Sequence, residues 1–253
     1  MVRRLIGETS SPLICAPLVG ANEEQLLAEL DRVLAKNPDI IEWRVDFFDQ
    51  AAEHDAVCAM VDTLKARMAN LPLIFTFRSQ REGGQPVAMG EKEIFALNVS
   101  VCERTAVEYI DCELSSQQEH IGALRAAAAA GNTKIIGSYH NFTATPSCRE
   151  LVDTLAQAQA HGLDVAKAAV MPQKPEDVLT LLSATLEAKQ QLQIPLITMS
   201  MGKFGAVSRL IGGVFGSSLS FAVGANASAP GQVPIEDMQE ALAIVSRAMG
   251  GGN

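Results

Sequence analysis

Short apolar runs alternate with longer stretches of helical periodicity along the whole chain. Eight runs have the length and composition of buried strands, at 12–18, 39–48, 72–78, 106–114, 133–140, 164–171, 194–201 and 217–223. Between and after them, apolar residues recur at helical spacing, which predicts helices at 22–37, 55–70, 90–104, 116–132, 147–162, 174–191, 206–215 and 234–250. Asn22 is expected to cap the first helix, and Gly131 to close the fourth.

This strict alternation predicts an α/β protein built as a (β/α)8 TIM barrel. Alternating strands and helices imply parallel strands joined by right-handed crossovers, and eight such units without a spare domain favour a closed barrel. The alternative is an open, doubly wound sheet, but its usual glycine-rich turn is replaced by LVGANEE after the first predicted strand. We expect residues 1–253 to form one domain, with 1–11 as an N-terminal cap on the barrel floor.

Composition and charge exclude several classes of function. The net charge of −9 leaves no overall basic surface for nucleic acid, and no apolar run reaches the ~18 residues of a membrane span. No signal peptide is expected at the start of the chain. The five cysteines lie far apart without a C-x-x-C pair, so we expect no disulfide framework or zinc site, and a cytoplasmic location. Three histidines on predicted helices are expected to contact solvent: His54, His120 and His161.

Polar residues cluster at the predicted C-terminal ends of the strands, where barrels of this type place their active sites. In the second strand Glu42, Arg44 and Asp46 alternate, so all three are expected on one face. The other strands and the segments that follow them supply Arg78, Glu82, Asp111, Glu113, His140, Lys167, Met199, Met201, Arg209, Ser228 and Gln232. A closed barrel would bring these side chains into one pocket.

Lys167 is the least expected of these residues, because it interrupts the small apolar strand DVAKAAV. Burial and neighbouring cations would disfavour its ammonium form, and a neutral amine attacks ketones to form a Schiff base. The alternative is a structural ion pair with Asp111, Glu113 or Glu42. His140 has two similar interpretations, as a general acid/base or as a buried polar histidine.

Six motifs together resemble type I 3-dehydroquinases, and they span nearly the whole chain in the right order. They are EWRVDFF, FTFRSQREGGQ, GSYHNFTATP, VAKAAVMPQ, TMSMGKFGAVSRLIGGVFGSSLSFA and ASAPGQVP. The resemblance implies a (β/α)8 barrel, typically a homodimer, without a metal or dissociable cofactor. It also implies dehydration of 3-dehydroquinate to 3-dehydroshikimate, by syn elimination through a lysine Schiff base, in the shikimate pathway that leads to the aromatic amino acids.

The resemblance also implies roles for individual residues. Lys167 occupies the lysine of the family's K-x-A-x-M-P pattern and would form the Schiff base, while His140 would be the general acid/base and Glu82 would orient it. Arg209 resembles the arginine that binds the substrate carboxylate. The other matches are substrate-binding positions: Glu42, Arg44 and Arg78 for hydroxyls and local charge, Met199 and Met201 in the pocket wall, and Ser228 and Gln232 on a loop that closes over substrate.

The chain departs from the family pattern at the end of the first strand. Ala16 or Pro17 stands where many members carry a serine that touches substrate, which removes one hydrogen bond and leaves the chemistry intact.

Two other functions compete with this interpretation. A class I aldolase would also use a barrel lysine, and Gly212-Gly213 could suggest its phosphate-binding loop. A barrel without activity, acting as a binding module, would be expected to lack the lysine or the histidine.

Overall fold

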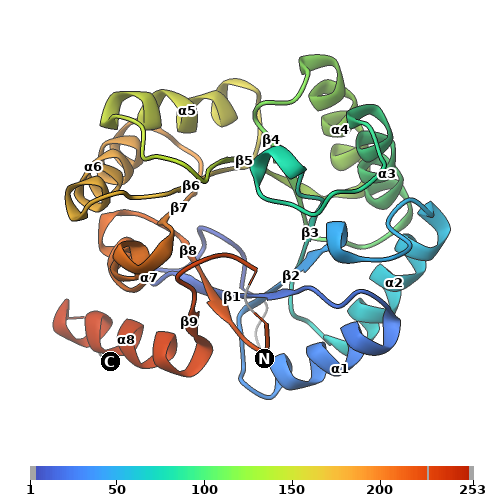
Figure 1. Cartoon of the computed structure of the whole chain (residues 1–253), viewed down its shortest axis with the longest axis horizontal. Helices are drawn as coiled ribbons and strands as arrows, with labels where there is room; N and C mark the ends of the chain where they lie inside the picture. The colour runs from blue at the N-terminus through green and yellow to red at the C-terminus, as the bar shows by residue number, and fades with distance from the viewer. Residues whose placement is uncertain (1–3, 227, 251–253) are drawn as a thin grey trace.

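The computed structural model describes residues 4–226 and 228–250, in which a ring of strands is surrounded by helices (Figure 1). The strands are β1 (Leu13–Leu18), β2 (Ile40–Arg44), β3 (Leu73–Thr76), β4 (Tyr109–Glu113), β5 (Lys134–Asn141), β6 (Val165–Val170), β7 (Leu196–Ser200), β8 (Leu219–Val223) and the short β9 (Val233–Pro234). The helices are α1 (Glu23–Leu34), α2 (His54–Arg67), α3 (Glu91–Arg104), α4 (Gln118–Gly131), α5 (Cys148–Ala160), α6 (Pro175–Gln191), α7 (Gly202–Phe215) and α8 (Ile235–Ala248).

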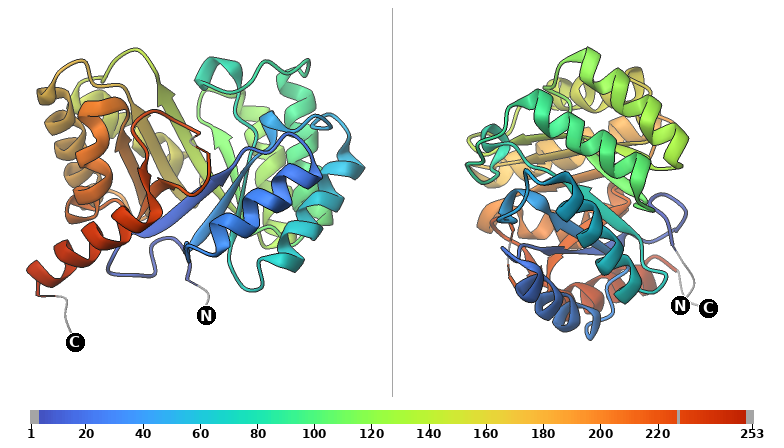
Figure 2. Two further views of the ribbon diagram at one scale, coloured as in Figure 1. Left: turned by 60° about the horizontal axis from the view of Figure 1, so that its bottom comes forward. Right: turned by 90° about the vertical axis from the view of Figure 1, so that its right-hand side faces the viewer.

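The strands pair in parallel in the order β7-β6-β5-β4-β3-β2-β1-β8, and β9 adds beside β8. The two ends of this curled sheet meet at one parallel bridge between Leu196 of β7 and Ser217, just before β8. The side views show the helices packed around the outside of the strands (Figure 2). The predicted barrel architecture is confirmed.

The contact between β7 and β8 is the weakest part of the ring. The amide of Ser218 donates to the carbonyl of Leu196 at 2.7 Å, and the amide of Thr198 donates to the hydroxyl of Ser217 at 3.1 Å. The Ser217 side chain thus replaces a backbone partner, and no ladder joins β7 to β8 in the described part of the chain. Backbone contact between the two strands in the described residues is therefore confined to their N-terminal ends.

Strand alternation separates two apolar cores. On β6, Ala166, Ala168 and Val170 pack outward in the core shared with the helices, while Val165 and Ala169 join the smaller core inside the barrel. Lys167 lies between those two inward residues, and its exposed fraction is 4%. The alternation therefore directs its side chain into the barrel interior.

The first described residues lie against the interior of the barrel. Ile6 is buried and packs with the interior core, partly buried Leu5 packs against that core, and the amide of Ile6 donates to the Tyr109 hydroxyl at 2.9 Å. Residues 1–3 lie outside the described part of the chain. These contacts support a cap over the barrel floor, and we retain that cap as a proposal.

Two helix-end predictions can be compared with the structure. Asn22 caps α1 as expected, since its side chain accepts from the amide of Gln25. Gly131 is the last residue of α4, but the left-handed turn belongs to Asn132, at φ 56°. Gly131 has a packing role instead, because a Cβ there would lie 2.1 Å from the carbonyl oxygen of Cys102 on α3.

Two other local predictions are corrected. β2 ends at Arg44, and a 3-10 turn at Val45–Phe47 takes Asp46 out of the strand alternation. The turn curls Asp46 back toward Arg44, where the two side chains pair. His120 is not simply solvated: its ring stacks on Phe95 with centroids 5.1 Å apart, and Nδ1 lies 2.9 Å from Glu91.

Candidate active site

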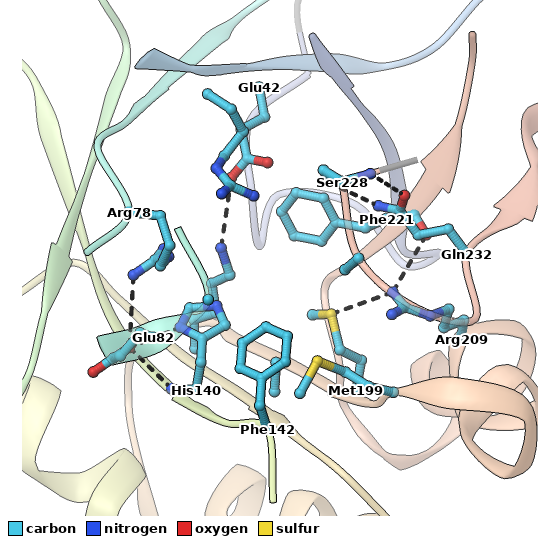
Figure 3. Close-up of a pocket in the computed structure, with 16 residues that line it drawn as sticks. Glu42, Arg78, Glu82, His140, Phe142, Met199, Arg209, Phe221, Ser228 and Gln232 are labelled. Atoms are coloured by element: carbon cyan, nitrogen blue, oxygen red, sulfur yellow. Dashed lines mark hydrogen bonds and ion pairs between the residues drawn. The ribbon is translucent and has the colours of Figure 1, made fainter. Parts of the chain in front are cut away.

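A pocket at the C-terminal ends of the strands contains every residue to which the family resemblance gives a role (Figure 3). Both residues from the loop after β8 and both methionines are among them. The lining residues are Glu42, Arg44, Arg78, Glu82, Gly83, His140, Phe142, Lys167, Ala169, Met199, Met201, Arg209, Phe221, Ser228, Ala229 and Gln232. The structure thus brings together residues from distant parts of the chain, as the barrel topology requires.

The amine of Lys167 lies among carboxylates and an aromatic ring. Its Nζ is 3.1 Å from Asp111 and 3.6 Å from Glu42, and it lies 4.7 Å from the centroid of the Phe221 ring. The sequence raised ion pairing and nucleophilic reactivity of Lys167 as alternatives. In the structure these alternatives do not exclude each other. The amine is paired, and it also lines the pocket where a ligand would meet it.

Arg78 connects the carboxylates behind the lysine. Its guanidinium lies 2.7 Å from Asp111 and 3.1 Å from Glu113, and it donates to the Ser138 hydroxyl at 3.0 Å. Ser138 in turn donates to Asp111 at 2.6 Å. Arg78 and Lys167, together with the Ser138 hydroxyl, hold the pKa of Asp111 below its usual value despite burial. Asp111 therefore remains a carboxylate between two cations.

His140 and Glu82 form a buried pair at the opposite side of the pocket from Arg209 (Figure 3). The Nδ1 of His140 lies 2.8 Å from Glu82, and the backbone amide of His140 donates to the same carboxylate oxygen at 3.0 Å. Burial lowers the pKa of His140 well below its usual value, and the charges of Arg78, Lys167 and Arg44 lower it further. The ring is therefore neutral near pH 7 and can accept a proton.

The neighbouring carboxyl group has the opposite shift. Burial raises the pKa of Glu82 to about 7, with Glu113 adding to the effect and Arg78 and the Ser115 hydroxyl opposing it. A carboxyl group that titrates near neutrality next to a neutral imidazole can share and return a proton. The pair therefore has the properties of a general acid/base unit.

Arg209 is buried, with an exposed fraction of 2%, and has no ion pair among the described residues. Its guanidinium faces the sulfur of Met199 at 3.4 Å and donates to the carbonyl oxygens of Phe221 and Pro230 at 3.5 and 3.3 Å, while its Nε has no partner in the described part of the chain. Because Met199 belongs to β7 and Phe221 to β8, the guanidinium occupies the space between these two strands.

Another cation of the pocket, Arg44, is already neutralised. Arg44 makes two hydrogen bonds of 2.8 Å to Asp46, and its guanidinium lies 5.2 Å from the ring of Phe47. Asp46 also accepts the amide of Gln85, which ties the loop after β3 to the same carboxylate. Arg209 is thus the buried arginine of the pocket that remains available for an anion.

The structure adds pocket residues that the sequence did not indicate, notably Gly83, Phe142 and Phe221. Gly83 adopts φ 85°, and a Cβ there would lie 2.3 Å from the Phe142 ring, so glycine permits the loop after β3 to approach that ring. Phe221 could have been inferred, because it shares the inward face of β8 with Leu219. Phe142 follows β5 and carries no comparable signal.

The departure at the end of β1 has little effect on the pocket. Ala16 packs outward in the core shared with the helices, whereas Pro17 is in register with Glu42 of β2 on the inner side. Neither residue belongs to the pocket lining.

Within the described ranges, no helix has the length and apolarity to cross a membrane, and no cluster of three His, Cys, Asp or Glu side chains could hold a metal ion.

Comparison with known proteins places the chain in a family. Residues 14–249 match the model of type I 3-dehydroquinase. A 3-dehydroquinate dehydratase from Albidiferax ferrireducens is 48% identical, over 95% of this chain and 91% of its own. The crystal structure of 3-dehydroquinate dehydratase from Geobacillus kaustophilus has a TM-score of 0.93 at 43% identity, covering 96% and 93% of the two chains.

A second solved structure is similar to nearly the same extent. It is a type I 3-dehydroquinate dehydratase from Clostridium difficile with covalent modified comenic acid, with a TM-score of 0.92 at 37% identity, and it covers 96% of this chain and 95% of its own. The family model and these relatives cover the barrel from β1 to α8. The chain therefore belongs to the type I 3-dehydroquinase family of hydro-lyases.

Proposed function

We propose that this protein dehydrates 3-dehydroquinate to 3-dehydroshikimate, in the shikimate pathway, through a Schiff base on Lys167. One observation carries the proposal: a buried lysine lies in the same pocket as a neutral histidine and a buried arginine without a carboxylate partner among the described residues. These three groups match a substrate that has a ketone, an acidic C–H next to it, and a carboxylate.

Arg209 binds the substrate carboxylate. The guanidinium has already lost its contact with water, so the protein has met that cost of burial before the anion arrives. A carboxylate would supply charge-assisted hydrogen bonds to a guanidinium that otherwise contacts only a thioether and two carbonyl groups. The ring hydroxyls face the remaining polar groups of the pocket, and the apolar walls hold the carbon skeleton. The groups concerned are Glu42, Arg44, Arg78, Ser228 and Gln232 for the hydroxyls, and Met199, Met201 and Phe221 for the ring.

Imine formation requires Lys167 to lose a proton and attack the C3 ketone. The neutral imidazole of His140 can take up that proton and return it to the carbinolamine hydroxyl, while the carboxylates of Asp111 and Glu42 lie 3.1 and 3.6 Å from Nζ. The carbinolamine then loses water to give an iminium, whose positive charge the same carboxylates stabilise. The covalent modified comenic acid described for the relative from Clostridium difficile supports covalent chemistry in the family.

His140 carries out the elimination. The iminium withdraws electrons and makes the C2 proton acidic, and the neutral imidazole removes this proton to leave an enamine. The electron pair of the enamine then expels the C1 hydroxyl group, which leaves as water after the imidazolium protonates it. A single base that acts on one face of the ring gives a syn elimination. Hydrolysis of the product imine restores the ketone and the free amine, so the cycle needs no added cofactor.

Reduction with borohydride tests the Schiff base. Wild-type protein incubated with 3-dehydroquinate and borohydride is expected to lose activity and to carry a reduced adduct on Lys167, as read by peptide mass spectrometry. Lys167→Ala should give no adduct, while His140→Ala should still be trapped but should lose dehydration by roughly 10²-fold or more. An adduct on Lys174 or Lys203, or none at all, would contradict the assignment.

The product assay separates this function from aldolase chemistry. Dehydration creates a conjugated enone, so ultraviolet absorbance should grow when the protein meets 3-dehydroquinate. Cleavage of a sugar phosphate without that absorbance would support an aldolase instead. The glycine pair that could suggest an aldolase phosphate loop, Gly212-Gly213, lies inside α7 rather than at the start of a helix.

We also propose a homodimer in the cytoplasm. All the large apolar side chains that are strongly exposed in the described residues lie on α6, α7, α8 or the residue after α8, which supports self-association through this side of the barrel. They are Leu179, Leu186, Phe204, Val207, Val214, Ile244 and Met249. Five free cysteines, four of them buried, support a reducing compartment.

A further inference from the structure

A buried carboxylate on α1 connects two loops at the rim of the pocket. Glu29 has an exposed fraction of 1%, and its Oε2 accepts the backbone amides of Val19 and Gly20 at 2.8 and 3.0 Å. Its Oε1 accepts the side-chain amide of Asn226 at 2.9 Å. We propose that Glu29 is a positioning residue, which holds the loop after β8 (described residues 224–226 and 228–232) through Asn226 so that Ser228 and Gln232 meet the substrate.

In the structure, both oxygens of Glu29 act as hydrogen-bond acceptors. All three partners are N–H donors, and no cation pairs with Glu29 among the described residues. A buried carboxylate is stabilised only if such donors satisfy it, and it loses much when one is removed. Asn226 is therefore held to α1 by a charge-assisted hydrogen bond, although the two residues are 197 positions apart in sequence.

The opposite end of the loop is held by the substrate-binding side of the pocket. The carbonyl oxygen of Pro230 accepts the amide of Gly202, at the start of α7, at 3.1 Å, and it also accepts from Arg209 at 3.3 Å. Gly231 adopts φ 77° and packs against Gly202, where a Cβ would lie 2.3 Å from the Gly202 carbonyl oxygen. The loop is thus tied to α7 at one end and to α1 at the other.

Ser228 lies between these two ties, and its pocket partner Gln232 follows the second tie. The amide of Ser228 donates to the side chain of Gln232 at 2.9 Å, and Gln232 donates back to the Ser228 hydroxyl at 3.2 Å. Asn226 precedes Ser228 by two positions, so the proposed tie at Glu29 acts close in sequence to this pair. Misplacement of binding groups by about 1 Å can cost roughly 10²-fold in rate, which makes Glu29 important although it does not line the pocket.

The inference rests on the proposed function, because it assumes that Ser228 and Gln232 bind the substrate of that reaction. The inference predicts that Asn226→Asp weakens substrate binding, because this substitution places a second carboxylate against Glu29. Glu29→Gln alone should be mild: its oxygen can still accept from Val19 and Gly20, and its amide group can pair with a rotated Asn226. In Glu29→Gln/Asn226→Asp the side-chain amide introduced at position 29 donates to the new carboxylate, so the hydrogen bond is restored with reversed polarity.

Kinetics and ligand binding of these variants test the inference. Asn226→Asp is expected to raise KM by roughly 10- to 100-fold with a smaller change in kcat, because Lys167 and His140 lie on other strands. The dissociation constant of quinate, the analogue with a hydroxyl in place of the C3 ketone, should rise by a similar factor in calorimetry. Both values should return to within a few-fold of wild type in Glu29→Gln/Asn226→Asp.

A matched control separates the specific contact from net charge. Glu24 lies on the exposed face of α1, so Glu24→Gln/Asn226→Asp removes the same charge as Glu29→Gln/Asn226→Asp. This control should not restore KM or the dissociation constant of quinate. Asn226→Ala removes the donor without adding a charge, and it replaces Asn226→Asp as the test if that variant fails to fold. It should raise KM by a smaller factor. Wild-type kinetics for Asn226→Asp, or rescue by Glu24→Gln and not by Glu29→Gln, would overturn the inference. Wild-type protein that neither turns over 3-dehydroquinate nor binds quinate would instead overturn the proposed function.

Discussion

At the scale of single residues, the pocket differs from an ordinary buried ion network in how its charges are distributed. Arg78 and Lys167 balance Asp111 and Glu113, and Asp46 neutralises Arg44. Arg209 has no such partner within the described residues, and its burial lowers its pKa to about 10. A cation held in this way is unstable by itself and becomes stabilised when an anion enters.

Arg209→Ala is expected to raise KM strongly with a smaller effect on kcat. Loss of one partner of a buried charge pair costs about 2–5 kcal/mol, which corresponds to roughly 30-fold or more in affinity. Steady-state kinetics on 3-dehydroquinate give both constants. Arg209→Lys is the control, since it keeps the charge and loses the planar donor pair, and we expect an intermediate KM. An unchanged KM in Arg209→Ala would show that another cation binds the carboxylate.

The pH dependence of kcat/KM should report Glu82 rather than His140. The pKa of Glu82 is raised to about 7, so kcat/KM is expected to rise with pH through that value, as the carboxylate forms and strengthens the imidazole as a base. The pKa of His140 lies well below 6.5, so loss of the neutral ring occurs at lower pH. In Glu82→Gln the inflection near the pKa of about 7 should vanish, leaving a lower and flatter profile. A wild-type profile that is already flat across neutral pH would contradict this assignment.

The sequence could identify the site residues because their strand positions and motifs are local properties. It could not assign their partners, which come from different strands. Lys167 is an example: chemistry left nucleophile and ion pair as alternatives, and the structure places Asp111, Glu42 and Phe221 around the same amine. Arg209 could be located by its motif, but its lack of a carboxylate partner among the described residues depends on the space between β7 and β8.

At the scale of the elements, apolar periodicity predicted all eight strands and all eight helices of the barrel, and the differences lie at their ends. β2 is shorter than its apolar run because Val45–Phe47 turn, and α7 begins at Gly202, four residues earlier than its apolar pattern begins. Periodicity records which residues are buried, and turns next to the pocket are buried as well. The exact end of an element depends on hydrogen bonds to other segments, which the local sequence does not contain.

Two glycines of α4 offer a paired test of element packing. A Cβ at Gly131 would collide with the Cys102 carbonyl at 2.1 Å, whereas a Cβ at the exposed Gly122 would meet nothing within 4 Å. Gly131→Ala is therefore expected to lower the free energy of unfolding by about 1–3 kcal/mol. Gly122→Ala should raise it by about 0.5–1 kcal/mol. Denaturant unfolding measures both, and equal effects of the two changes would contradict the role given to Gly131.

At the scale of the whole molecule, the exposed apolar side chains are unevenly distributed. They gather on α6–α8, whereas the outer faces of α1–α5 carry none of the strongly exposed large apolar residues found in the described chain. An uneven distribution of this kind is typical of a surface that another protein covers. The sequence could predict dimerisation only by resemblance, since which helix faces remain uncovered depends on how the ring closes.

A charged residue on α7 should weaken the proposed dimer. Val207 is 45% exposed in the middle of this surface, and Val207→Asp would bury a carboxylate in an apolar contact. Sedimentation velocity should show a dimer for wild type and a monomer for the variant. Lys92→Glu, at an exposed position on α3, should remain dimeric. A monomeric wild type, or a dimer that Val207→Asp leaves intact, would exclude this surface.

Because one bridge joins β7 to β8 in the described residues, a bound substrate is expected to reduce local opening of this contact. The proposed intermediate, joined covalently to Lys167 on β6 and by an ion pair to Arg209, would link β6 to a guanidinium that contacts Met199 of β7 and Phe221 of β8. Amide exchange at Ser217 and Ser218 should then be slower once the trapped adduct is in place than in the free protein, and this slowing should exceed that at the well-paired β4–β5 contact. The proposed intermediate would thus add a link beside the one backbone bridge that the described residues form between β7 and β8.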